Sequence, residues 1–287
     1  MQWRGRRGSR NIEDRRGQSR MSGGTTVRLG KGGLGVLAIV VVGYFLGVDL
    51  TPLLDGTQQG PVTQQSGPLS EREKSMGDFV SVTLADTEDV WQGIFTQQLG
   101  KTYHPVTLVL YSGVTQSACG NASGATGPFY CPGDKRVYLD TAFFDTLSQQ
   151  LGAKGDFAAA YVVAHEVAHH VQDELGILGK VNDLRAQSSA AQSNALSVRI
   201  ELQADCFAGI WARAAQDEIG MVEPGDIAEA MNAAAWIGDD TLQREAGRAV
   251  MPDSFTHGSS VQRQRWFQRG YQSGELRQCD TFSVRNL

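Results

Sequence analysis

The pattern of hydrophobic and polar residues predicts a mainly helical protein with a small β-sheet. Residues 105–111 and 135–140 show the two-residue alternation of strands, and the glycine- and serine-rich segment 113–134 separates them. Helical spacing of apolar residues then predicts helices at 142–151, 156–175, 190–217, 225–237 and 259–271. The expected fold class is therefore α+β, with helices in the majority.

A further helix is expected to open the folded domain. Ser70 and Glu73 have the spacing of a capping box, in which each residue caps the backbone of the other. Apolar positions recur from Phe79 to Phe95, and Gly100 ends the pattern. We therefore expect the domain to cover residues 71–287.

The chain before this domain divides into three parts of different composition. Residues 1–31 carry a net charge of +7, although the whole chain of 287 residues has a net charge of −5. Residues 32–48 are apolar and uncharged, and three leucines extend the run to residue 54. Since 17 residues of helix span about 25 Å, near the short limit for a bilayer, we expect a transmembrane anchor over 32–54. The Gly/Gln/Ser-rich residues 55–70 are typical of a flexible linker.

The charge next to the apolar run predicts a membrane topology. Lysine and arginine remain on the cytoplasmic side, so residues 1–31 are expected to form a cytoplasmic tail and residues after 54 to lie outside. A basic tail beside an apolar run indicates a membrane rather than nucleic acid as partner. A cleaved signal peptide is the alternative, but its charged region is rarely this long, and no small-x-small cleavage site follows the run.

His165, Glu166 and His169 form a His-Glu-x-x-His motif inside the predicted helix 156–175. Residues four apart lie about 40° apart around a helix, one turn along, so both imidazoles can reach one metal ion. Imidazole ligands suit Zn²⁺, which lowers the pKa of a bound water to roughly 7. Glu166 lies about 100° around the helix from His165, where it can act as general base without being a ligand. The motif predicts a catalytic zinc site.

The third zinc ligand must come from farther along the chain. The extended metzincin motif needs Gly at 172 and His at 175, where this chain has Gln172 and Leu175. Glu201 and Asp205 share one face of the predicted helix 190–217. We expect Glu201 to complete a His₂Glu site and Asp205 to accept the other ring N–H of a ligand histidine. A solvated acidic helix face is the alternative.

With these motifs the chain resembles the gluzincin branch of zinc metallopeptidases. It resembles more closely the bacterial family called "putative neutral zinc metallopeptidase". The segments that carry this resemblance are MQWRGRR (1–7), NIEDRRG (11–17), GPFYCP (127–132), HEVAHHVQ (165–172), ELQAD (201–205) and THG (256–258). The resemblance implies a zincin-like peptidase domain that holds a peptide or protein substrate along an edge strand beside the metal. It also places the anchor in the bacterial plasma (inner) membrane, with the catalytic domain periplasmic or otherwise extracytoplasmic.

The four cysteines agree with an oxidising compartment. Cys119 and Cys131 bracket one loop, so we expect a local disulfide between them. Cys206 and Cys279 would then pair, although Cys206 could instead be a buried free thiol. No Cys-x-x-Cys occurs, which argues against a cysteine metal site.

His257 is a candidate for stabilising the oxyanion of a tetrahedral intermediate, with helix capping or packing as the alternative. Two classes of function remain. The first is an active membrane-anchored zinc endopeptidase. The second is a catalytically idle envelope protein that uses the zincin fold as a binding or scaffold module. The presence of Glu166 favours the enzyme, because binding alone does not need a general base.

Overall fold

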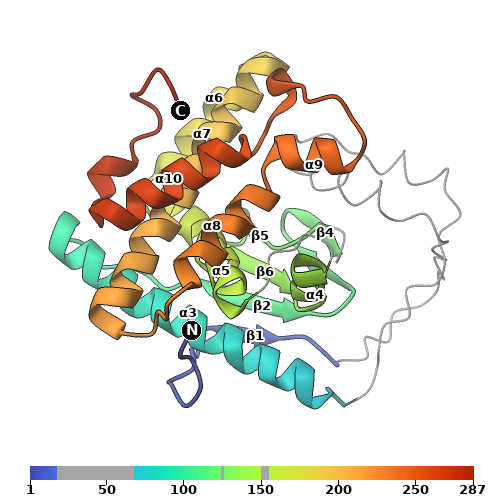
Figure 1. Ribbon diagram of the computed structural model, residues 1–287, viewed down its shortest axis with the longest axis vertical. Coiled ribbons are helices and arrows are strands. Elements are labelled where there is room, and N and C mark those ends of the chain that lie inside the picture. Colours follow the sequence, from blue (N-terminus) through green and yellow to red (C-terminus); the bar gives the residue numbers. More distant parts are fainter. Residues whose placement is uncertain (18–67, 124–125, 150–154) are drawn as a thin grey trace, which may run out of the picture.

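An almost fully buried helix, α5 (Asp156–Glu174), runs through the middle of the protein (Figure 1). The computed structural model describes residues 1–17, 68–123, 126–149 and 155–287. Within α5, every residue from 157 to 172 is buried. A helix that is buried on all sides needs neighbours on all sides. They are α3 (Glu71–Ile94), α7 (Ala190–Ala214), α8 (Asp226–Trp236) and part of a β-sheet.

The remaining helices and turns, some of them predicted with slightly different ends, complete the helical part of the fold. They are α4 (Ala142–Gln149), α6 (Ile177–Ala186), α9 (Asp239–Glu245), α10 (Ser260–Ser273), the π-helical turns η1 (Phe95–Leu99) and η2 (Ala215–Ile219), and the 3₁₀ turns η3 (Pro252–Ser254) and η4 (Leu276–Cys279). The capping box of Ser70 and Glu73 is present at the start of α3. The mainly helical α+β class is confirmed, whereas α6 and α9 were not predicted.

The main sheet has four strands in the order β1-β2-β6-β5. These strands are β1 (Ile12–Asp14), β2 (Thr107–Tyr111), β5 (Phe129–Cys131) and β6 (Arg136–Asp140). The first three strands in that order run parallel, and β5 is an antiparallel edge strand that packs against α5. The predicted loop 113–134 also holds a separate hairpin, β3 (Val114–Ser117) with β4 (Gly120–Ser123). Its strands are too short to show a clear alternation in sequence.

The basic N-terminal segment belongs to the same folded unit as the helices. Strand β1 pairs in parallel with β2, so that Ile12 lies opposite Leu108. The Arg6 guanidinium is 2.6 Å from the Asp86 carboxylate on α3, and Arg16 donates to the backbone oxygen of Glu73. The prediction that residues 1–31 form a separate tail is therefore wrong for residues 1–17, because Arg6, Arg7 and Arg16 contact acidic or backbone groups of α3.

This strand pairing also bears on the predicted membrane topology. Among the described residues no helix is long and apolar enough to cross a membrane, and the predicted anchor 32–54 lies outside them. A single crossing between β1 and α3 would leave β1 and β2 on opposite sides of the bilayer. The predicted single pass and the parallel pairing of Ile12 with Leu108 therefore exclude each other.

Helices α7 and α10 lie side by side and pack unusually closely (Figure 1). A Cβ atom added to Gly270 on α10 would lie 1.8 Å from the backbone oxygen of Cys206 on α7. One added to Gly209 would lie 2.0 Å from the backbone oxygen of Phe267. Glycine is thus needed at both positions for the two backbones to touch.

Both expected disulfides are present, Cys119–Cys131 and Cys206–Cys279. The alternative of a free thiol at Cys206 is therefore excluded. The second disulfide joins α7 to η4 near the C-terminus, across 73 residues of sequence.

Candidate metal centre

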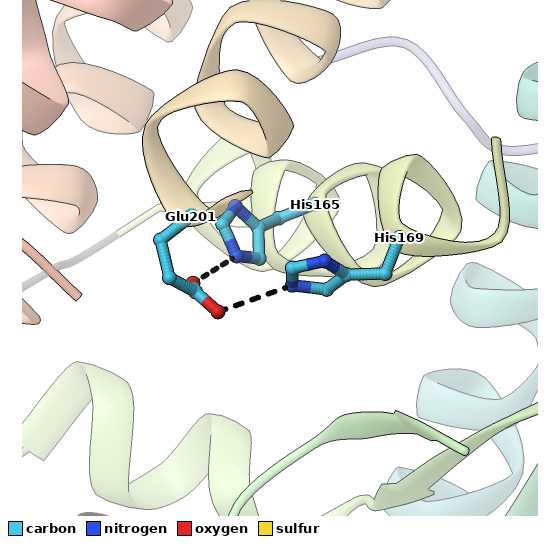
Figure 2. Close-up of side chains that lie close together, drawn as sticks. All are labelled: His165, His169 and Glu201. Carbon is cyan, nitrogen blue, oxygen red and sulfur yellow. Dashed lines mark hydrogen bonds and ion pairs between the residues drawn. The ribbon is translucent and has the colours of Figure 1, made fainter. Parts of the chain in front are cut away.

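His165, His169 and Glu201 converge on one point inside the protein (Figure 2). One ligand atom from each residue lies within 4.8 Å of the others. The Nε2 of His165 is 3.1 Å from one Glu201 oxygen, and the Nε2 of His169 is 3.5 Å from the other. The histidines come from one turn of α5, and the crossing of α7 over α5 supplies the glutamate. The grouping expected from the two motifs is present.

This donor set fits zinc. Two imidazole nitrogens and a carboxylate are typical of a catalytic zinc site with a coordination position left for water. Burial alone would raise the pKa of Glu201, but the imidazoles of His169 and His165 outweigh it and hold that pKa well below its usual value of 4.5. A buried, ionised carboxylate between two imidazoles is the arrangement expected where a cation is to be bound.

Glu166 is buried next to these ligands but is not one of the three that converge. Its Oε2 has no hydrogen-bond partner among the described residues, which is unusual for a buried polar atom. Burial raises the pKa of this carboxyl above 4.5, although the neighbouring histidines act in the opposite direction. An unpartnered carboxylate oxygen beside the ligand group is suited to accept a proton from a water at the same point.

A network of charged side chains contacts the Nδ1 side of the His165 ring. Its Nδ1 lies 2.9 Å from Asp205 Oδ1, as an ion pair rather than a linear hydrogen bond. Two nitrogens of Arg263 contact the Asp205 carboxylate, each at 2.9 Å, and the Tyr161 hydroxyl donates to it at 2.5 Å. Although burial raises the pKa of Asp205, the Arg263 guanidinium outweighs this effect and lowers it below 3.8.

The predicted position of Asp205 behind His165 is therefore found, but its partners were not predicted. Tyr161 binds both Asp205 and Arg263 through its hydroxyl. The position of Tyr161 one turn before His165 is a weak signal that sequence reasoning could have used. Arg263 gives no such signal, because only the contact of α10 with α7 brings it to Asp205.

A neutral side chain holds His169. Its Nδ1 is 2.9 Å from Gln172 Oε1, one turn along α5. The amide nitrogen of Gln172 donates to the backbone oxygen of Ile200 on α7, at 2.8 Å. The same glutamine that rules out a metzincin motif thus orients the second histidine.

His257 is buried in a loop that one carboxylate organises. The Oδ2 of Asp239 accepts the backbone N–H groups of Thr256, His257 and Gly258, at 2.8, 2.7 and 2.9 Å, and Asp239 Oδ1 is 3.2 Å from His257 Nδ1. Burial lowers the pKa of His257, but Asp239 and Glu201 outweigh it, so the net shift is upward from 6.5. His257 therefore lies within electrostatic range of the metal ligand Glu201. Asp239 was missed, because nothing in its spacing links it to the motifs.

Helix α5 is also tied to the edge strand β5, through residues next to the motif. The Tyr130 hydroxyl on β5 donates to Asp173 at 3.0 Å and lies 3.3 Å from His170 Nδ1. His170 Nε2 in turn contacts the backbone oxygen of His104 at 2.7 Å. These contacts fix the edge strand relative to the helix that carries the motif.

Comparison with known proteins agrees with this geometry. Residues 1–282 match the family described as "putative neutral zinc metallopeptidase". The chain belongs to this family. The match starts at residue 1, in keeping with the N-terminal segment that completes the sheet.

Two relatives show how far the similarity extends. The uncharacterized protein YpfJ of Escherichia coli K12 is 51% identical over 288 residues, which cover 98% of this chain and 99% of YpfJ. The uncharacterized protein Mb2605 of Mycobacterium bovis is 48% identical over 188 residues, or 62% of each chain. No solved structure is significantly similar to the chain.

Proposed function

We propose that this protein is a zinc-dependent endopeptidase. The observation that carries the proposal is the buried convergence of His165, His169 and Glu201, with an unpartnered oxygen of Glu166 beside it. A binding module would have no use for that oxygen, which is costly to bury without a partner. Membership of a family described as metallopeptidases supports the same reaction.

The metal position and Glu166 divide the chemistry of peptide hydrolysis. His165, His169 and Glu201 would hold the zinc ion, which would supply polarisation of the scissile carbonyl and acidification of the attacking water. Glu166 takes the proton of that water and passes it to the leaving nitrogen. Its raised pKa brings it closer to neutral pH, where proton acceptance and proton return are best balanced.

His257 is proposed to donate to the oxygen that gains negative charge in the transition state. Its upward-shifted pKa favours the protonated imidazole, which is the better donor. Asp239 holds the Nδ1 side of the ring. The carboxylate also fixes the backbone of the loop through three N–H groups, so that the donor is already in place before the substrate binds.

The substrate is proposed to be an extended peptide lying along β5. This strand ends the four-stranded sheet and packs against α5, beside the helix turns that carry the ligands. An edge strand offers backbone N–H and C=O groups to which a peptide can add as a further strand. Such pairing selects extended backbone more than sequence, so it supports an endopeptidase without naming a cleavage site.

The experiment that tests the function is Glu166→Gln, with Glu174→Gln on the same helix as control. Purified full-length variants are compared for zinc content and for cleavage of a peptide library. Glu166→Gln should keep one zinc and lose about a hundredfold or more in hydrolysis, because an amide cannot accept the water proton. Glu174, which contacts His104 outside the site, should be replaceable without loss. Equal cleavage by both variants excludes this site, and zinc binding without cleavage even by the wild type favours the idle binding module.

We place the domain outside the cytoplasm. Two disulfides support an oxidising compartment. Because β1 pairs with β2, residues 1–17 must share that compartment, whatever the path of the chain between them. Single cysteines at the exposed positions Arg10 and Lys180 test this with a membrane-impermeant thiol reagent. Both should react alike in intact cells whose outer barrier is opened, and opposite labelling would contradict a shared compartment.

A further inference from the structure

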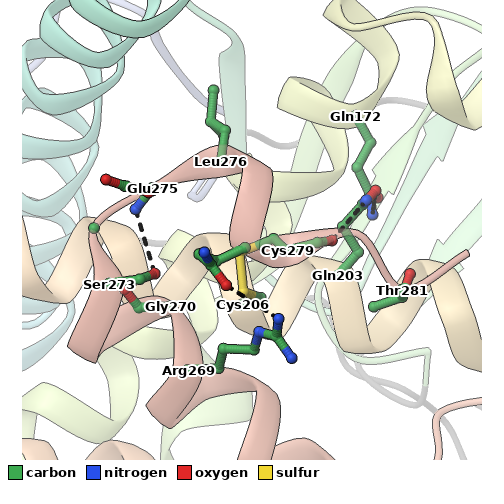
Figure 3. The surroundings of a disulfide bond; sticks show 12 residues. Gln172, Gln203, Cys206, Arg269, Gly270, Ser273, Glu275, Leu276, Cys279 and Thr281 are labelled. Carbon is green, nitrogen blue, oxygen red and sulfur yellow. Dashed lines mark hydrogen bonds between the residues drawn. A yellow bond between two sulfur atoms is a disulfide. The ribbon is translucent and has the colours of Figure 1, made fainter. Parts of the chain in front are cut away.

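The support of His169 continues beyond Gln172 into a chain of amide hydrogen bonds that ends at a disulfide. Besides Ile200, the amide nitrogen of Gln172 donates to Gln203 Oε1 at 3.1 Å. The amide nitrogen of Gln203 donates in turn to the backbone oxygen of Cys279, at 3.0 Å. Figure 3 shows the two glutamines and Cys279 beside the disulfide. Both glutamines are buried, and Gln172 is 0% exposed.

The backbone oxygens of Ile200 and Cys279 determine which group donates and which accepts in each of these amide hydrogen bonds. A carbonyl oxygen can only accept, so Ile200 and Cys279 each require an NH₂ group to face them. Gln203 then turns its oxygen toward Gln172, and Gln172 turns its oxygen toward His169. The Nδ1 of His169 must therefore carry the proton, which leaves the lone pair of Nε2 for a metal.

The Cys206–Cys279 disulfide holds the last acceptor of this hydrogen-bond series, the Cys279 carbonyl, in place. Gln203 and Cys206 are three residues apart on α7 and so lie on the same helix face. The bond from Cys206 to Cys279 keeps the Cys279 carbonyl beside the turn of α7 that carries Gln203. Without that bond the carbonyl could move away, and the Gln203 amide could turn over.

We propose that Gln203 is a positioning residue of the metal centre, which sets the tautomer of His169 through Gln172 and is itself fixed by the Cys206–Cys279 disulfide. The proposal rests on the proposed zinc site, but it concerns metal binding and not hydrolysis. Groups that orient a metal ligand typically change metal affinity by about 10–100-fold when removed. Because Ile200 also orients Gln172, we expect the loss of Gln203 to fall near the lower end of that range.

The central test is Gln203→Met in the full-length chain, with Gln264→Met as matched control. Gln264 on α10 also donates its amide to a backbone oxygen, that of Met231, but has no contact with the chain of amides. Zinc affinity is measured by competition with a chromophoric chelator. Gln203→Met should bind zinc about 10-fold more weakly, whereas Gln264→Met should match the wild type.

The two disulfides provide a second matched pair. Cys206→Ser with Cys279→Ser should weaken zinc binding several-fold, because the terminal carbonyl is no longer tethered. Cys119→Ser with Cys131→Ser removes the other disulfide, of similar Cα separation, 5.8 against 5.6 Å, which joins the β3–β4 turn to β5 and includes no residue of α7. That pair should leave zinc affinity unchanged even if it lowers stability.

A readout without metal separates positioning from general destabilisation. Nitrogen NMR of the metal-free chain distinguishes Nδ1–H from Nε2–H at His169, independently of zinc binding and of activity. The wild type should show Nδ1–H, and Gln203→Met should show a mixture of tautomers at unchanged secondary structure. An unchanged tautomer in Gln203→Met, or equal zinc loss in Gln264→Met, would overturn the proposal. Normal affinities and tautomers in a chain that hydrolyses no peptide would instead affect only the proposed function.

Discussion

The two histidines that we propose to bind zinc lie one turn apart on α5, but their rings are held by a charged group in one case and a neutral group in the other. Behind His165 is a carboxylate, Asp205, that is buried, ionised and paired with a buried arginine. Behind His169 is an uncharged amide, Gln172, whose own partners are an amide and a backbone carbonyl. Both supports fix a ring orientation, yet only the first buries charge.

Because of this difference, substitutions next to His165 and next to His169 should change stability and metal affinity to different extents. Removing one member of a buried ion pair leaves the other charge without a partner, which is strongly destabilising. Removing a neutral amide leaves only hydrogen-bonding groups unpaired, at a smaller cost. The His165 support should therefore affect folding and metal binding together, and the His169 support mainly metal binding.

The largest effect is expected from Asp205→Asn. Arg263 and His165 would lose their anionic partner in the interior, and we expect a loss of about 3–5 kcal/mol in unfolding free energy. Chemical denaturation of the metal-free chain measures it. A double replacement, Asp205→Leu with Arg263→Met, should recover more than half of that loss while leaving zinc affinity low. A double variant as unstable as the single one would show that the pair is not the cause.

The pH dependence of the metal-free chain should report the same charged support. Burial lowers the pKa of His165, but Asp205 and Glu201 outweigh it and raise that pKa from 6.5 to about 9. A pKa that is higher in the folded state gives stability that is complete below pH 6.5 and lost as pH rises through 9. The expected loss is up to about 3 kcal/mol. It is measured by urea denaturation between these pH values, and a clearly flatter profile is expected for Asp205→Asn.

Gln172→Met tests the neutral support and should separate the two properties. The cost in unfolding free energy should be about 1–2 kcal/mol, because Ile200 and Gln203 lose a hydrogen-bond donor. Zinc affinity should nevertheless fall by about 10–100-fold. Denaturation and chelator competition on the same sample measure both. If Gln172→Met loses as much stability as Asp205→Asn, the contrast between the two supports does not hold.

The smallest effect is expected from Tyr161→Phe. The phenol contributes one hydrogen bond to Asp205 and receives one from Arg263, while the Arg263–Asp205 pair itself remains. We expect a loss of about 1 kcal/mol in stability and less than a twofold change in zinc affinity. A large drop in zinc affinity would show that the tyrosine, and not the ion pair, holds His165.

The N-terminal segment shows where sequence patterns misled. Its arginines indicated a tail in another compartment, yet residues 1–17 pair with α3 and add β1 to the sheet. Three strand residues flanked by charge carry no alternation that a pattern could reveal. Their place in the sheet depends on β2, almost a hundred residues later along the chain.

Sequence alone determined what lies within one helix. The spacing of His165 with His169, and of Glu201 with Asp205, sets their relative positions because helical geometry is local and regular. It therefore predicted the grouping of His165, His169 and Glu201 and the contact of Asp205 with His165. Tertiary structure decided which helices cross and how closely. Only the contact of α10 with α7, at Gly209 and Gly270, brings Arg263 to Asp205, and only the disulfide brings the Cys279 carbonyl to Gln203. Such partners depend on packing between segments that are distant in sequence. The spacing of residues along the chain does not predict that packing.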